Sequence, residues 1–240
     1  VAPSRGLGDV YKRQGFVADL TGRIRWDENN VLAVRVSAAH DPLTPPGKPQ
    51  ERMDFYYYSG IYRDVHMVIT DKVYITDELQ EDIVAGGGQF ITYPEVSPEF
   101  ARTHVSTHIR NLSDKGMYLQ VVSRLIDSNG KTVSENKTQS KLNRESATTV
   151  EQDLPLAHPA LWHPYSPNLY TLQTQLISQG KILDERQQQI GIRHIRYTAK
   201  EGFFINGKKL YLRGANRHQA YPNVGDAASN SMQEREVIDL

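Results

Sequence analysis

The chain has 240 residues, 38% of them hydrophobic, which is enough for one large or two ordinary domains with a packed core. Its 28 Lys and Arg residues balance its 28 Asp and Glu residues, so net charge gives no general attraction to nucleic acid or to an anionic membrane. The absence of cysteine excludes disulfides and thiol catalysis, and no apolar run reaches the ~18 residues of a membrane-spanning helix. We therefore expect a soluble protein that binds neither nucleic acid nor membrane. Its compartment, cytoplasmic or periplasmic and secreted, stays unknown.

The first segment, up to residue 72, predicts part of a β-sandwich. Residues 1–14 show no strand or helix period and no signal-peptide pattern, and we leave them unassigned, with a non-native scar as one interpretation. Residues 31–37 and 65–70 are rich in β-branched and apolar side chains, on either side of a polar, proline-rich stretch. These two runs predict strands of one sandwich over residues 15–72.

The second segment, residues 73–197, shows short alternating runs. Mostly apolar residues recur at every second position in 105–109, 119–125 and 170–176, with the polar residues Thr107, Ser123 and Thr174 among them, and Ser128-Asn129-Gly130 is a turn signal between them. Several short strands without a long helical pattern predict an all-β sandwich of immunoglobulin size, ~100 residues.

The third segment, residues 198–240, changes to the pattern of an α/β unit. Asn206-Gly207 lies between two apolar runs, and this pair readily adopts the positive φ angles of a tight hairpin. The second run predicts a strand over 210–213, followed by a loop and by a helix whose start is indicated by the capping-box spacing of Ser231 and Glu234. A pure sandwich protein would not need this strand, loop and helix.

Three polar residues, Asn216, Arg217 and His218, follow the predicted strand at its carboxyl end. In an α/β barrel that end faces the active-site mouth. An amide, a fixed cation and an imidazole together can hydrogen-bond the hydroxyls of a sugar. A capped strand with a structural arginine explains the same pattern without a ligand, and the residues alone favour this second interpretation.

Three motifs resemble glycoside hydrolase family 2, the family of β-galactosidases and β-glucuronidases. They are RGANRH followed by YPNVGDA at 213–227, DFYYYSGIYRDV at 54–65 and LWHPYSPNLYTL at 161–172, and they occur in the family's order. The resemblance implies a mostly β fold. It comprises a jelly-roll portion over 15–72, an immunoglobulin-like sandwich over 73–197, and the first βα unit of a truncated (β/α)8 TIM barrel over 198–240.

The resemblance also implies a function and its residues. The implied function is that of a retaining exo-glycosidase, with a β-galactosidase as the first candidate and a carbohydrate as the partner. For the intact enzyme, the resemblance also implies Na+ or Mg2+ as a possible ion and a homo-oligomer as a possible assembly. His218 matches a histidine that lines the sugar subsite, and Asn216 and Arg217 match its neighbours. Asp54 matches an aspartate near the 6-hydroxyl of the sugar and a sodium ion. The two catalytic glutamates, about 5–5.5 Å apart in such enzymes, match positions beyond Leu240, so the fragment alone is expected to be inactive and to hold no cofactor.

The departures from the family pattern keep alternatives open. Gln219 stands where many relatives have Glu, and Ala220 and Tyr221 replace further histidines of well-known β-galactosidases. A β-glucuronidase or β-mannosidase of the same family therefore remains an alternative. A non-catalytic carbohydrate-binding β-sandwich protein is the alternative from another class. The carboxyl groups near the polar cluster are interpreted as a solvated loop and helix face rather than the catalytic pair; they are Asp226, Glu234, Glu236 and Asp239.

Two weaker signals concern His104, His108 and Trp162. The two histidines have the four-residue spacing of a helical metal site, but they alternate with apolar residues as in a strand, where they would lie about 13 Å apart. We expect no metal there. Trp162 could be a sugar-stacking platform, although a tryptophan in a sandwich is more often packed in the core.

Overall fold

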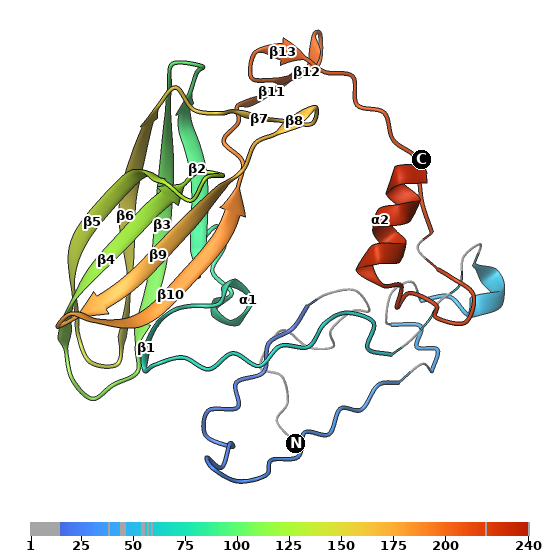
Figure 1. Cartoon of the computed structure of the whole chain (residues 1–240). Coiled ribbons are helices and arrows are strands. Elements are labelled where there is room, and N and C mark those ends of the chain that lie inside the picture. The colour runs from blue at the N-terminus through green and yellow to red at the C-terminus, as the bar shows by residue number, and fades with distance from the viewer. Residues whose placement is uncertain are drawn as a thin grey trace. The chain divides into compact units, whose positions relative to one another are not determined.

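The computed structural model describes residues 15–37, 39–43, 47–53, 56, 58, 60–218 and 220–239 (Figure 1). The chain divides into two compact units. One unit is Ile69–Arg213, and the other combines Val1–Val68 with Gly214–Leu240. No described helix is both long enough and apolar enough to cross a membrane.

The unit Ile69–Arg213 is built on two four-stranded antiparallel sheets (Figure 1). In the first sheet the long strand β3 (Phe100–Asn111) pairs with β6 (Ser146–Ala157), and also with β1 (Val73–Ile75) and β2 (Gln89–Val96). The second sheet has the order β10-β9-β4-β5; its strands are β4 (Met117–Ile126), β5 (Thr132–Leu142), β9 (Tyr170–Ser178) and β10 (Lys181–Ile190). The predicted all-β sandwich is confirmed.

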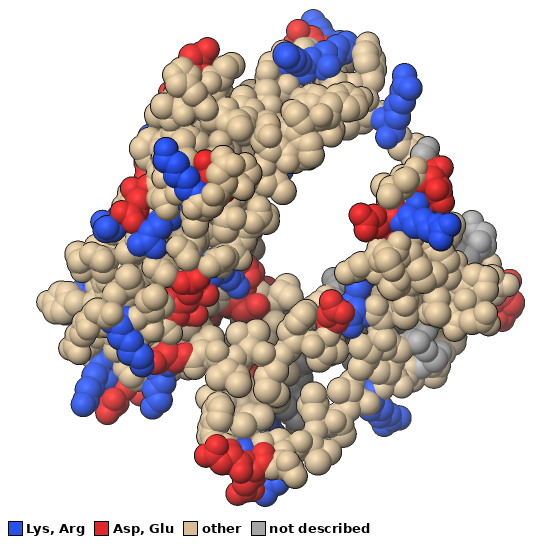
Figure 2. All heavy atoms as spheres, in the orientation of Figure 1, with Lys and Arg blue, Asp and Glu red and all other residues tan. Residues whose placement is uncertain are grey.

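Strict alternation of side chains produces the two faces of each sheet. In β3 every second residue is buried from Ala101 to Asn111, as expected for a strand with one face against a core. The helix α1 (Glu78–Glu81) lies between β1 and β2, capped by the side chain of Asp77, which accepts from two backbone N–H groups. Figure 2 shows acidic and basic side chains interspersed over the solvent-exposed face in view.

The core between the sheets consists of two apolar clusters with a polar layer between them. One cluster includes Val105, Leu125 and Leu172, and the other includes Ile109 and Leu176. At the strand positions between the clusters, four strands each bury a polar side chain; they are Thr107, Ser123, Gln152 and Thr174. This layer is hydrogen-bonded from sheet to sheet, because Ser123 Oγ donates to Gln152 Oε1 at 2.7 Å and lies 2.9 Å from Thr174 Oγ1.

A small sheet follows the sandwich and contains β11 (Ile195–Thr198), β12 (Gly202–Ile205) and β13 (Lys208–Lys209). Asn206 and Gly207 form the turn between the last two strands, with φ values of 49° and 76°. The predicted hairpin is therefore confirmed, since both residues have the left-handed conformation of a two-residue turn. A further short hairpin joins β7 (Trp162–His163) to β8 (Ser166–Pro167).

Several predicted strands are wrong. Residues 31–37, 65–70 and 210–213 form no strand in the structure, and η1 (Gln50–Arg52) is the only regular element among the described residues before β1. A strand needs a hydrogen-bonded neighbour, and none of these segments belongs to a sheet formed by the described residues; their one backbone hydrogen bond to such a residue runs from the Leu210 N–H to the Phe203 carbonyl, at 2.9 Å. Their apolar side chains remain exposed, as at Val31 (94%) and Val68 (80%). Among the described residues, the runs predicted as strands of the jelly-roll portion and as the first strand of the TIM barrel are thus not part of a sheet.

The C-terminal helix is present, although it begins earlier than its predicted cap. The helix α2 spans Asn230–Asp239, and the Oγ of Ser229 accepts a hydrogen bond from the Met232 N–H at 3.3 Å. Ser229 is thus the residue that caps the first turn, and Ser231, predicted in that role, lies inside the helix.

Candidate functional site

Arg217 of the polar motif lies at the centre of a hydrogen-bonded group that we call the Arg217 cluster, made of Arg217, Tyr221, Gln233 and Glu236. The guanidinium donates to Gln233 Oε1 at 2.7 Å and to Tyr221 Oη at 2.9 Å, and it forms an ion pair with Glu236. Tyr221 Oη also donates to Glu236. The cluster therefore attaches the segment 214–218 to α2, which supplies Gln233 and Glu236.

In the Arg217 cluster, hydrogen bonding stabilises the charged forms of Arg217 and Glu236. The hydrogen bond from Arg217, and then the one from Tyr221, lowers the pKa of Glu236 to about 2. The bond to Glu236 raises the pKa of Arg217 above its usual value and also raises the pKa of Tyr221. Near neutral pH Glu236 is a carboxylate and Arg217 a cation, so neither is suited to move a proton during catalysis.

The loop after the polar motif is closed by its own backbone. The N–H groups of Tyr221 and Gly225 each donate to the other residue's carbonyl, at 3.0 and 2.9 Å. Gly225 has φ +58°, and a Cβ there would lie 2.8 Å from Cγ of Tyr58. The glycine is required both by its left-handed conformation and by the close approach of the tyrosine ring.

Tyr58 belongs to the 54–65 motif, so its packing on Gly225 brings two distant sequence motifs together within one unit. The rings of Tyr56 and Tyr58 lie 6.0 Å apart between centroids and are tilted by 34°. Aromatic rings in this arrangement next to polar groups are common where sugars bind, although they also occur in ordinary packing.

The predicted site residues differ in what the structure shows of them. Asn216 and His218 are exposed on the segment 214–218, next to Arg217. Asp54 and Gln219 lie outside the described residues, so the predicted contacts of Asp54 with the sugar and with sodium stay predictions. Within the described part of the chain, no three His, Asp or Glu side chains are grouped so as to hold a metal ion.

His104 and His108, which have the four-residue spacing of a helical metal site, contact different partners. Both lie in β3, as the alternation predicted. His104 pairs with Asp153 at 2.8 Å and Glu151 at 3.0 Å on the neighbouring strand β6. His108 Nδ1 lies 2.9 Å from Thr76 Oγ1.

Trp162 is half-buried and packed. Its indole lies against Gly191, where a Cβ would come within 2.8 Å of the ring, and the Arg193 guanidinium lies 5.2 Å from the ring centroid. Asn206 of the hairpin donates to the Trp162 carbonyl at 2.9 Å and accepts from the His194 N–H at 2.9 Å. The motif at 161–172 therefore holds the small sheet against the end of the sandwich.

Comparison with known proteins agrees with this architecture. Residues 88–193 match the family model for glycosyl hydrolases family 2. A protein of Formosa agariphila, named as a candidate β-glucuronidase, is 32% identical over 226 residues, covering 94% of this chain and 25% of its own length. A β-galactosidase of Bacteroides ovatus is 30% identical over 227 residues, covering 95% of this chain and 25% of its own length. The chain belongs to glycoside hydrolase family 2.

The family 2 assignment extends to the fold. The crystal structure of a Bacteroides uniformis β-glucuronidase superimposes with a TM-score of 0.71 at 27% identity, over 85% of this chain and 24% of the other. The matched residues 88–193 run from the start of β2 to just beyond β10, which is most of the sandwich. This family 2 chain spans about a quarter of the length of the two curated relatives named above.

One contact of the site was not predicted from the sequence of this family 2 chain. Glu236 was expected on a solvated helix face, and on that partly exposed face it is also the carboxylate partner of Arg217 and Tyr221. The only sequence signal was its position near the end of a predicted helix that follows the polar motif. A spacing of 19 residues across a loop has no fixed geometry, so the pair could not be predicted.

Proposed function

We propose that the full-length protein is a retaining exo-glycosidase and that this chain supplies part of its sugar subsite. The observation that supports this most is the packing of Tyr58 on Gly225, which joins the two motifs from which the sugar contacts are expected. In this proposal, residues 15–72 belong to a jelly-roll domain and residues 198–240 begin a TIM barrel. Residues 73–197 are the immunoglobulin-like domain that connects them.

His218 and Asn216 are proposed to hydrogen-bond the hydroxyls of the terminal sugar, together with Asp54 from the other motif. Arg217 then acts as a positioning residue, because its guanidinium is already bound to Glu236, Tyr221 and Gln233. A side chain fixed by three partners holds the backbone of 214–218 in place, and therefore also its exposed neighbours. A sodium ion near Asp54 is part of the same proposal.

The bond-breaking groups are proposed to lie beyond Leu240. A retaining mechanism needs two carboxyl groups, one as acid and base and one as nucleophile. Glu236 has a pKa of about 2 and an arginine partner, which makes it unsuitable as the acid. We therefore propose that the 240-residue chain alone does not hydrolyse glycosides.

A terminal β-galactoside is the first candidate substrate, and a β-glucuronide is the second. The relatives named above include proteins of both descriptions, which supports the wider class of β-glycosides more than either sugar. A β-mannoside remains a third candidate. A carbohydrate partner is common to all of them, and a homo-oligomer is compatible with each.

The residue roles are tested with His218→Ala and Asp54→Asn in the full-length protein. Loss of one hydrogen bond to the sugar should lower kcat/KM by about 10- to 100-fold, since such bonds contribute ~1–3 kcal/mol when their partner is left unpaired. His104→Ala is the matched control, because His104 lies on the sandwich with Asp153 and Glu151. Equal losses in His104→Ala and His218→Ala would contradict a sugar-binding role for His218.

A further inference from the structure

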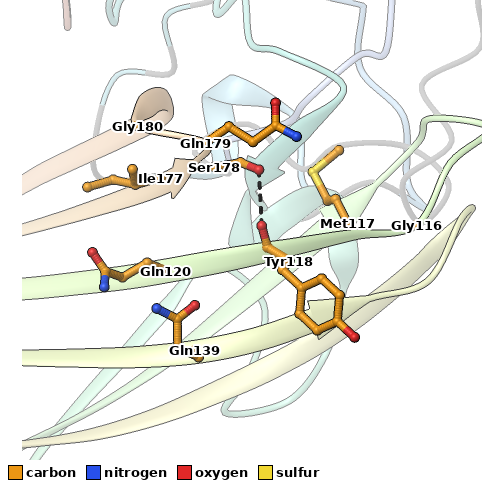
Figure 3. A pocket seen from close by; sticks show the side chains of 9 residues that line it. All are labelled: Gly116, Met117, Tyr118, Gln120, Gln139, Ile177, Ser178, Gln179 and Gly180. Carbon is orange, nitrogen blue, oxygen red and sulfur yellow. Dashed lines mark hydrogen bonds between the residues drawn. The ribbon is translucent and has the colours of Figure 1, made fainter.

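A hollow with a volume of about 620 Å³ lies on the sandwich, at the end of the sheet where β4 begins and the β9–β10 turn reverses the chain (Figure 3). Its lining includes Tyr118, Gln120, Gln139, Ile177 and the turn residues Gln179 and Gly180. The volume is in the range of sites for small molecules, ~300–1,000 Å³. The hollow lies entirely within the unit Ile69–Arg213 and shares no residue with the Arg217 cluster.

The strand register brings the lining side chains to one face. Gln120 is paired with Gln139 on β5 and with Ile177 on β9, so these three side chains lie in one row across the sheet. Leu119 and Val121, the neighbours of Gln120 in the chain, are fully buried in the core. Since side chains alternate along a strand, the row of Gln120 lies on the outer face, away from the core. Ser178 Oγ donates to the Tyr118 carbonyl at 3.0 Å and so fixes the rim (Figure 3).

Further along the same outer face, the polar side chains are occupied by one another. Arg124 donates to Glu135 at 2.7 Å and to Gln175 at 2.8 Å. Glu185 accepts from Gln175 and from Gln187, each at 2.6 Å. The amides of Gln120 and Gln139, in contrast, have no hydrogen-bond partner among the residues that the structure describes.

The hollow therefore combines free amides with apolar surface. The Tyr118 side chain is 69% exposed, and Lys141 approaches its ring only to 5.9 Å from the centroid. An exposed aromatic ring packs well against the C–H face of a pyranose, while each glutamine amide both donates to and accepts from sugar hydroxyls. No carboxylate or cation belongs to the lining, which favours an uncharged ligand.

We propose that this hollow is a second, non-catalytic binding site for a neutral oligosaccharide. Tyr118 supplies the stacking surface, and Gln120 and Gln139 supply the hydrogen bonds. The site would hold a neighbouring part of a glycan without reacting with it. It does not depend on the proposed hydrolysis, because it is built only from residues of the sandwich.

The experiment titrates the 240-residue chain with cellotetraose, β-1,4-galactotetraose and the anionic tri-galacturonate by isothermal calorimetry. We expect at least one neutral tetraose to bind with a Kd of about 0.1–1 mM, as is usual for one ring and a few hydrogen bonds. Tyr118→Ala should weaken this binding by about 10-fold or more, and Gln139→Ala by several-fold. Each variant should keep the wild-type melting temperature, because both side chains are exposed.

Two controls separate this site from other surfaces. Tyr165→Ala removes another exposed tyrosine, and Gln189→Ala removes an outer-face glutamine that donates to Thr171, so both should leave the Kd unchanged. The proposal is overturned if neither tetraose binds at about 10 mM, or if only tri-galacturonate binds. It is equally overturned if Tyr165→Ala weakens binding as much as Tyr118→Ala.

Discussion

The buried polar layer of the sandwich should be a strongly coupled unit, and Gln152 is its most connected member. The side chain is only 2% exposed. Its amide donates to the Val121 carbonyl and to Thr138 Oγ1, each at 3.1 Å, and accepts from Ser123 Oγ at 2.7 Å. Gln152→Leu keeps the approximate volume but removes the acceptor of Ser123 Oγ at 2.7 Å and the donor to the Val121 carbonyl and to Thr138 Oγ1.

The expected cost follows from the partners that become unsatisfied. A buried group left without its hydrogen bond costs ~1–3 kcal/mol, so Gln152→Leu should lower the free energy of unfolding by about 2 kcal/mol. For a domain of this size that corresponds to a fall in Tm of roughly 6–8 °C. Ser123→Ala alone should cost about 1–2 kcal/mol, because it leaves Gln152 Oε1 without a donor.

Urea unfolding of both single variants and of the double variant measures the coupling. Replacing both partners by apolar groups should recover part of the loss, so the double variant is expected to be more stable than the sum of the singles predicts, by ~1–2 kcal/mol. The urea m-value should not change. Strictly additive effects would refute the idea that Ser123 and Gln152 act as one hydrogen-bonded pair.

Three further predictions concern single positions. Thr103 buries a hydroxyl with no hydrogen-bond partner in the described structure, so Thr103→Val should raise the free energy of unfolding by ~0.5–1 kcal/mol in the same urea assay, and a loss would show that the hydroxyl is bonded. Gly225→Ala should destabilise by ~1–3 kcal/mol, because the Cβ meets a tyrosine ring at 2.8 Å on a backbone with φ +58°. Gly214→Ala, where a Cβ meets nothing within 4 Å, is its control, and equal Tm shifts would contradict the packing. The carboxyl of Glu236 should titrate by NMR near pH 2. Because its pKa is lowered on folding, its stabilising contact is complete above the ordinary value of ~4.3 and is lost as pH falls through about 2. Arg217→Ala should raise the midpoint toward ~4.3, although the hydrogen bond from Tyr221 still lowers it, and an unchanged midpoint would rule out the ion pair.

The sequence predicted those parts of the fold that depend on local patterns. Alternation in 105–109 and 170–176 indicated strands because each sheet has one buried face, and Asn206-Gly207 indicated a turn because few other pairs adopt two positive φ angles. The segment 31–37 has the same composition as a strand, yet no sheet formed by the described residues includes it. Composition reports the preference of a segment, whereas a strand also requires a neighbour with which to pair.

The site was less predictable because its contacts cross long stretches of chain. Arg217 and Glu236 meet across a loop and a helix, and Tyr58 meets Gly225 from a segment more than 160 residues earlier. The contacts of the buried polar layer could not be predicted for the same reason. In the sequence, Ser123 and Thr174 were recognisable only as polar residues at positions that are otherwise apolar. Their partners became clear only from the pairing of strands on two sheets.

The most direct test of the central proposal is hydrolysis by the full-length protein. Nitrophenyl β-galactoside, β-glucuronide and β-mannoside are assayed side by side with the 240-residue chain as the inactive comparison. We predict that the full-length protein hydrolyses at least one of the three and that the 240-residue chain hydrolyses none. A folded full-length protein that hydrolyses none of them would contradict the glycosidase proposal and favour a non-catalytic carbohydrate-binding protein.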